Sequence, residues 1–129
     1  MNDIYGIGEA YWEIPPGWRD LREAMIEEMN VALAADGIDP KDYHVVQVKE
    51  KYGVLDFHGS HSGPATDAVI AKYARLAACT CCECGKPAEF ISLGWIEPWC
   101  GLCKSIKERE GRMKFRTLNQ EEKEECGIC

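Results

Sequence analysis

The fold of this chain is decided by two stretches, Cys81-Cys82-Glu83-Cys84-Gly85 and Trp99-Cys100-Gly101-Leu102-Cys103, which hold two C-x2-C pairs separated by fifteen residues. Each pair brings two thiolates to one side of a tight turn, and Gly85 allows the backbone to direct its amides towards a sulfur. Two such turns complete a tetrahedron of sulfur ligands, which is typical of structural zinc. The sequence therefore predicts one Zn²⁺ in a zinc ribbon, held by Cys81, Cys84, Cys100 and Cys103.

Four protein ligands leave no coordination position for water, so this site is expected to be structural and not catalytic. Two other interpretations of these thiols stay open. They could be buried free thiols, or Trp99–Cys103 could form a redox turn of the thioredoxin type, which would make the protein a thiol oxidoreductase. A redox turn needs a βαβ setting, whereas Gly94, Pro98 and the matched upstream pair favour a ribbon.

The remaining cysteines suggest a possible second metal site. Cys79 and Cys82 also stand at C-x2-C spacing, interleaved with the first pair, and the chain ends in Cys126-Gly127-Ile128-Cys129. These four residues could hold a second Zn²⁺ and attach the C-terminal tail to the body, with free thiols as the alternative. Cys81 and Cys82 would then have to face different metals. His58 and His61 form a further candidate pair.

The chain is expected to be one cytoplasmic domain that makes no membrane contact. Its 129 residues, 46% hydrophobic and 29% charged, suit a globular protein with a real core. It has no apolar run of membrane-spanning length, and Met1-Asn2-Asp3 does not begin a signal peptide. In a reducing compartment, the cysteines are expected to be metal ligands and not disulfides.

Charge is unevenly distributed along the chain. The net charge of −7 disfavours a protein that coats nucleic acid, because phosphate binding depends on clustered Lys and Arg. Residues 1–40 hold nine acidic residues, and the helix predicted there presents Glu23, Glu27 and Glu28 as candidate partner-binding residues. Residues 104–116 instead hold six basic residues against two acids, so a nucleic-acid-binding zinc ribbon is the main alternative. The basic residues are Lys104, Lys107, Arg109, Arg112, Lys114 and Arg116.

Hydrophobic periodicity predicts an α+β fold. Residues 1–16 are predicted as an irregular arm that closes with Pro15-Pro16. An α+β body over 17–78 is predicted to contain a helix to Ala35, a β-hairpin over 44–57 and a second amphipathic helix that ends near Cys79. The zinc ribbon and a short helix follow over 79–112, and residues 113–129 are expected to be a charged, solvated tail.

No catalytic motif is present in the sequence, so an enzyme is not expected. The chain lacks the H-x-E and P-C-x-x-C elements of zinc deaminases, a G-x-S-x-G elbow and a phosphate-binding G-x-x-x-x-G-K loop. Its histidines, His44, His58 and His61, all precede Cys79, unlike those of a nuclease built on a cysteine ribbon.

A resemblance to a known family adds context. The hairpin stretch Val48-Lys49-Glu50-Lys51-Tyr52-Gly53-Val54-Leu55-Asp56-Phe57, the helix after it, Cys81-x-x-Cys84-Gly85 and Gly94-Trp95 resemble small uncharacterised proteins common in bacteriophage and prophage genomes. These proteins share a K-E-K-[FY]-G-x-L-x-F hairpin and a C-x-x-C-G ribbon, and the resemblance covers about residues 15–105. It implies a phage-type accessory protein with a zinc ribbon but no particular activity. Asp56 stands where a basic residue is usual, so a basic contact made by the family hairpin is not implied here.

Together these features predict a zinc-binding, non-enzymatic interaction protein of phage type. An acidic surface on a small protein could occupy a nucleic-acid groove of a host defence complex, as an anti-CRISPR protein would. The expected partner is therefore a host protein complex.

Overall fold

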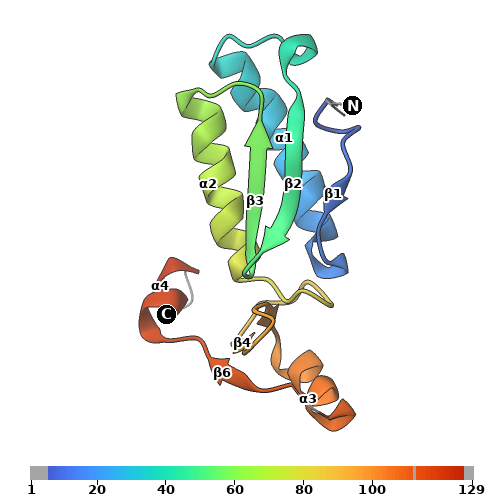
Figure 1. Ribbon diagram of the computed structural model, residues 1–129. Coiled ribbons are helices and arrows are strands. Elements are labelled where there is room, and N and C mark those ends of the chain that lie inside the picture. The colour runs from blue at the N-terminus through green and yellow to red at the C-terminus, as the bar shows by residue number, and fades with distance from the viewer. Residues whose placement is uncertain (1–5, 112, 127–129) are drawn as a thin grey trace.

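The computed structural model describes residues 6–111 and 113–126 of the chain and confirms an α+β fold. Figure 1 shows an upper body of long helices and a sheet, and a smaller C-terminal unit formed by residues 79–126. The body comprises β1 (Trp12–Glu13), a 3-10 turn η1 (Pro16–Trp18), α1 (Arg19–Ala35), η2 (Pro40–Asp42), β2 (Val45–Lys51), β3 (Val54–Gly59) and α2 (Pro64–Ala78). The C-terminal unit comprises β4 (Phe90–Ser92), β5 (Pro98–Trp99), α3 (Gly101–Glu110), β6 (Phe115–Thr117) and α4 (Gln120–Glu125).

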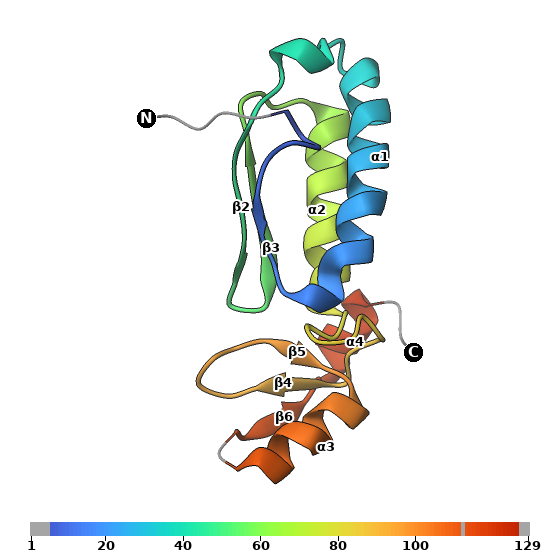
Figure 2. The same cartoon turned by 90° about the vertical axis from the view of Figure 1, so that its right-hand side faces the viewer.

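The body is a two-layer arrangement in which α1 and α2 cover one face of the sheet β1-β2-β3 (Figure 2). The helix α1 turns Met25, Met29 and Leu33 towards the sheet at helical spacing, and each is at most 1% exposed. Burying side chains of this size stabilises the fold by about 1.5–3 kcal/mol each. Phe57 of β3 and Tyr73 of α2 complete the same core.

The predicted hairpin is confirmed as the antiparallel pair β2–β3, in which Val48 pairs with Phe57. Its turn places two consecutive residues at positive φ, Tyr52 at 54° and Gly53 at 81°. This is the pattern of a type I′ turn, whose twist matches that of the strands. The Glu50 carboxylate accepts a hydrogen bond from the Gly53 amide at 2.7 Å and so closes the turn.

The C-terminal unit is built on the antiparallel sheet β5-β4-β6, and α3 begins directly after β5. The ring of Trp99 packs edge-on against Phe115 with centroids 5.8 Å apart, and the Lys104 ammonium lies 4.6 Å from the centroid of Phe90. Apart from cysteines, the buried apolar side chains of this unit are Ala88, Ile91, Pro98, Trp99 and Leu118, which form only a small apolar core. Domains with so little core commonly need a metal or a disulfide for stability.

Two sequence predictions were wrong in part. The segment predicted as an irregular arm contains β1, which pairs in parallel with β2 and buries Trp12 to 5% exposure. The segment predicted as a solvated tail contains β6, paired with β4, and the helix α4 with its Asn119 capping box. Residues 6–16 and 113–126 therefore belong to the folded structure.

Candidate metal centre

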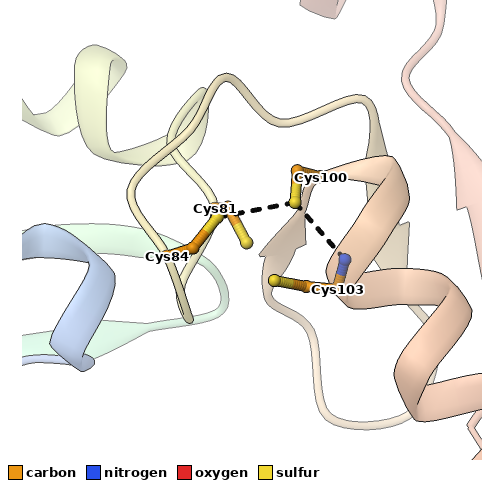
Figure 3. A group of neighbouring side chains, drawn as sticks. All are labelled: Cys81, Cys84, Cys100 and Cys103. Carbon is orange, nitrogen blue, oxygen red and sulfur yellow. Dashed lines mark hydrogen bonds between the residues drawn. The ribbon is translucent and has the colours of Figure 1, made fainter.

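The four predicted zinc ligands converge on one point between the first cysteine pair and the start of α3 (Figure 3). The Sγ atoms of Cys81, Cys84, Cys100 and Cys103 all lie within 4.8 Å of one another, and those of Cys84 and Cys100 are 3.5 Å apart. A regular tetrahedron with Zn–S bonds of about 2.3 Å has edges of about 3.8 Å. The sulfur atoms thus have the number, chemistry and spacing that a tetrahedral zinc ion requires.

Local hydrogen bonds form the first ligand turn. The Cys81 amide donates to the Lys86 carbonyl at 2.7 Å, and the Gly85 amide donates to the Cys81 carbonyl at 3.1 Å. Gly85 has a φ of +83°, which is the left-handed conformation that glycine adopts at no steric cost. The positive φ fits the conformational freedom predicted for this glycine, although its own amide donates to a carbonyl oxygen and not to a sulfur.

The second ligand turn is the N-terminus of a helix. Cys100 is the N-cap residue of α3, and its Sγ accepts a hydrogen bond from the Cys103 amide at 3.4 Å. The positive end of the helix dipole therefore faces the cluster and favours thiolates over thiols. The same feature is found in redox-active thiol pairs. Here, however, the sheet before α3 is antiparallel and a second pair of thiols adjoins it, which is the ribbon setting and not a βαβ unit.

The thiols influence one another's ionisation. A hydrogen bond from the Cys82 thiol, aided by backbone amides of the two turns, lowers the pKa of Cys81. Burial raises the pKa of Cys103, and the neighbouring Cys100, Cys84 and Cys81 raise it further. Cys81 thus favours its thiolate form, whereas Cys84 and Cys103, whose pKa values are raised, ionise less readily unless a positive charge lies among them. A divalent cation bound to all four sulfur atoms supplies that charge.

The cluster is anchored to the body by η1. The Gly17 amide donates to the Cys82 carbonyl at 2.8 Å, and the indole N–H of Trp18 donates to the Thr80 carbonyl at 3.0 Å. A Cβ atom on Gly17 would lie 2.0 Å from the Cys81 carbonyl oxygen, so only glycine fits. The Cys82 amide in turn donates to the Pro98 carbonyl at 2.9 Å, which joins the two ligand turns. The hydrogen bond from Gly17 to Cys82 could not be predicted from the sequence, because Gly17 lies far from the cysteines in the chain.

The predicted second metal site does not form as proposed. Cys79 and Cys126 are joined in a disulfide between the end of α2 and the end of α4. Disulfide sulfur atoms are not thiolates, and the thiolate is the form that binds metal. Cys82 is buried and donates its thiol hydrogen bond to Cys81, and Cys129 lies outside the described residues. The expectation that these cysteines are metal ligands and not disulfides is therefore wrong for Cys79 and Cys126, and their disulfide attaches α4 to the end of α2.

The three acids proposed for partner binding have different roles in the structure. Glu23 and Glu27 are exposed on α1, and Glu23 pairs with Arg22. Glu28 instead accepts hydrogen bonds from Lys72 and from the Tyr73 hydroxyl, so it joins α1 to α2. Burial and this carboxylate raise the pKa of Tyr73 to about 12. Glu28 is therefore mainly a structural residue.

A groove between α1 and α2 adjoins these acids. It has a volume of about 600 Å³, and Glu27 and Glu28 line it together with the small apolar side chains of both helices. Val31, which also lines the groove, is 72% exposed. The apolar lining consists of Val31, Ala32, Ala35, Ala65, Ala68 and Val69.

Three of the five described basic residues over 104–116 are neutralised by ion pairs. Lys104 pairs with Glu108, Lys107 pairs with Glu110, and Arg116 pairs with Glu122. Arg112 lies outside the described residues. The predicted histidine pair is also not assembled into a metal site among the described residues: His58 pairs with Asp56, and His61 contacts Ser60.

Over residues 6–111 and 113–126, no helix is both long and apolar enough to span a bilayer. No protein-family model, curated protein or solved structure matches this chain.

Proposed function

We propose that this protein binds one structural Zn²⁺ through Cys81, Cys84, Cys100 and Cys103 and acts as a non-enzymatic interaction protein. The convergence of the four sulfur atoms within 4.8 Å carries the first part of the proposal. Bound zinc would crosslink the two ligand turns without offering a position for water. Because the C-terminal unit has little apolar core, that crosslink would hold the unit folded against η1.

The interaction surface in this proposal is the groove between α1 and α2. Its floor is apolar and built from small side chains, which allows a partner backbone to approach closely. The Glu27 carboxylate lines the groove and adds negative charge, and Glu23 is exposed one turn earlier on the same helix, where it pairs with Arg22. An amphipathic segment with apolar residues on one face and Lys or Arg beside them matches both features.

The proposed occupant is a basic segment of a host protein that itself handles nucleic acid. The resemblance to phage proteins and the net charge of −7 support this choice, because an acidic protein can occupy a surface built for phosphates. A host defence complex such as a CRISPR effector has such surfaces. The ion pairs within the basic segment argue against the alternative of a nucleic-acid-binding ribbon.

The test uses a defined amphipathic helical peptide with Lys or Arg flanking a leucine face, titrated by calorimetry into the zinc-loaded protein. Binding should weaken as salt rises, and Val31→Asp or the double change Glu23→Lys, Glu27→Lys should weaken it at least about tenfold. The matched control is Glu124→Lys, Glu125→Lys, which makes the same charge change in the last turn of α4. An equal loss of peptide affinity in both double variants, or no binding of the peptide by wild type, would contradict the proposed surface.

A further inference from the structure

A second pocket lies where the turn of the β2–β3 hairpin meets the loop between β4 and β5. Figure 2 shows the hairpin turn directed at the C-terminal unit on the side where this loop extends. The pocket has a volume of about 260 Å³ and is lined by residues 50–52 of the hairpin and 94–96 of the loop. The lining residues belong largely to two stretches, Lys49–Gly53 and Gly94-Trp95, that lie far apart in the sequence and both take part in the resemblance to phage proteins. The pocket shares no residue with the α1–α2 groove.

Two large aromatic side chains stand exposed at this pocket. Tyr52 and Trp95 are each 72% exposed, whereas Trp12, Trp18 and Trp99 are at most 5% exposed. The core therefore uses the other three tryptophans and leaves Trp95 in solvent. Exposed Trp and Tyr beside a concave surface are the residue types that contribute most to binding at protein interfaces.

The pocket is held in shape by both of its walls. On the hairpin side, Tyr52 occupies a left-handed backbone position at the tip of the turn, which the Glu50 carboxylate closes. On the loop side, the buried Ser92 hydroxyl donates to the Trp95 carbonyl and accepts from the Glu97 amide. A Cβ atom on Gly53 would lie 3.5 Å from the Ile96 carbonyl oxygen, so the turn and the loop are in close contact. The two aromatic residues are therefore presented by a largely preformed site.

The charge around the pocket is negative. Glu50 lines it, and Glu97 lies next to it in a half-buried position. Burial raises the pKa of Glu97, the nearby charge of Glu50 raises it further, and a hydrogen bond from the Trp95 side chain opposes both. Lys51 also lines the pocket and offsets part of this negative charge, which leaves the two carboxylates of Glu50 and Glu97 against one ammonium group.

We propose that this pocket binds an arginine side chain of a protein partner, with the guanidinium against the rings of Tyr52 and Trp95 and paired with the Glu50 carboxylate. A guanidinium stacks on aromatic faces and pairs with carboxylates, and this pocket offers both groups within one cavity. A nucleobase could also stack on exposed rings. Its phosphates would, however, approach Glu50 and Glu97, whose charges repel them.

The experiment measures binding of N-acetyl-arginine methylamide to the full chain loaded with zinc. Since Trp95 is the exposed tryptophan, its fluorescence reports on the pocket, and the amide signals of Tyr52 and Gly53 report on it by NMR. The matched probe is N-acetyl-citrulline methylamide, which has nearly the same shape without the charge. We expect the arginine probe to bind at millimolar concentration and the citrulline probe to bind at least about tenfold more weakly.

Three variants locate the binding. Trp95→Ala and Tyr52→Ala should each abolish the NMR shifts, and Glu50→Gln should weaken binding about threefold or more while still accepting the Gly53 hydrogen bond. Tyr11→Ala, which removes an aromatic ring that is 80% exposed elsewhere, should leave binding unchanged. Unchanged zinc content and melting temperature would show that each variant is folded. Equal binding of the two probes, arginine shifts that persist in Trp95→Ala, or tighter binding of an oligothymidylate would each overturn the proposal.

Discussion

The indole nitrogen of Trp18 donates a hydrogen bond to the carbonyl oxygen of Thr80, across 62 positions of sequence and next to the first zinc-ligand candidate. Trp18 is 1% exposed and precedes α1, so its position is set by the body core. Thr80 is followed directly by Cys81. The geometry of the cysteine cluster and the packing of the body are therefore linked through a few atoms around η1.

This link predicts a strong effect of Gly17→Ala. The added Cβ would lie 2.0 Å from the Cys81 carbonyl oxygen, and a backbone atom there cannot move without disturbing the first ligand turn. We expect the free energy of unfolding to fall by about 3 kcal/mol and zinc to dissociate faster. Thermal unfolding and zinc transfer to a colorimetric chelator measure the two effects.

Gly8→Ala is the control for that substitution, because a Cβ on Gly8 would meet no atom within 4 Å. It should leave stability and zinc release almost unchanged. Similar melting curves for the Gly17 and Gly8 variants would show that η1 does not constrain the cluster.

The metal centre predicts one zinc ion per chain. Cys81→Ser or Cys100→Ser should lose the metal, since each removes one of four converging sulfur atoms. A chelator should then unfold at least the C-terminal unit, because structural zinc is linked to folding by about 10 kcal/mol or more. Elemental analysis and circular dichroism measure these outcomes.

Cys82 provides a matched control within the same turn. It is buried beside Cys81 but lies outside the sulfur cluster, and serine at this position can still donate a hydrogen bond to Cys81. Cys82→Ser should therefore keep one zinc per chain. Loss of zinc in this variant together with retention in Cys81→Ser would assign the ligands differently.

The metal cluster and the hairpin could be predicted from sequence because their determinants are local. Each C-x2-C pair specifies its own turn, and the alternation around Val48 and Phe57 specifies both strands. The pairing of β1 with β2, of β6 with β4, and of Cys79 with Cys126 depends on residues far apart in the chain. The two-residue strand Trp12–Glu13 is too short to show an alternating pattern in the sequence. It pairs with β2 because Trp12 packs in the core of the body. Similarly, no local pattern could show that Tyr52 and Trp95 line one pocket.

The disulfide predicts a redox-dependent stability that does not involve the metal. Cys79 and Cys126 are 47 positions apart, and closing a loop of that length stabilises a fold by up to about 4 kcal/mol in the chain-entropy description. Reduction by a phosphine, or Cys126→Ser, should lower the melting temperature while zinc stays at one per chain. Cys126→Ser should show no further change on reduction. Uptake of a second zinc by the reduced wild type would instead support a metal site at these thiols.

Asp36 follows α1 and caps α2. Its carboxylate accepts hydrogen bonds from the Ala65 and Thr66 amides and from the Thr66 hydroxyl, each at 2.9 Å. The N-cap residue of α2 itself, Gly63, has no side chain to do this. Asp36 therefore satisfies the first amides of a helix 29 and 30 positions away in sequence.

These hydrogen bonds, the Thr66 amide foremost, lower the pKa of Asp36 below its ordinary value of 3.8. A group whose pKa is lowered by folding stabilises the fold at pH values above its unfolded pKa, and this contribution is lost as the pH falls through the folded pKa. Asp36→Asn should thus be less stable than wild type at neutral pH, because asparagine offers a single acceptor atom and no charge. The difference in the free energy of unfolding between wild type and Asp36→Asn should shrink below about pH 3.8.

Chemical denaturation across pH checks this expectation. The difference between variant and wild type is the informative quantity, since acid also protonates the zinc-binding thiolates and destabilises both proteins alike. Asp42→Asn is the control, because the carboxylate of Asp42 is exposed and accepts no hydrogen bond from the described residues. A stability difference for Asp36→Asn that stays constant from neutral pH to pH values well below 3.8 would mean that the charge of Asp36 does not contribute to holding α2 against the end of α1.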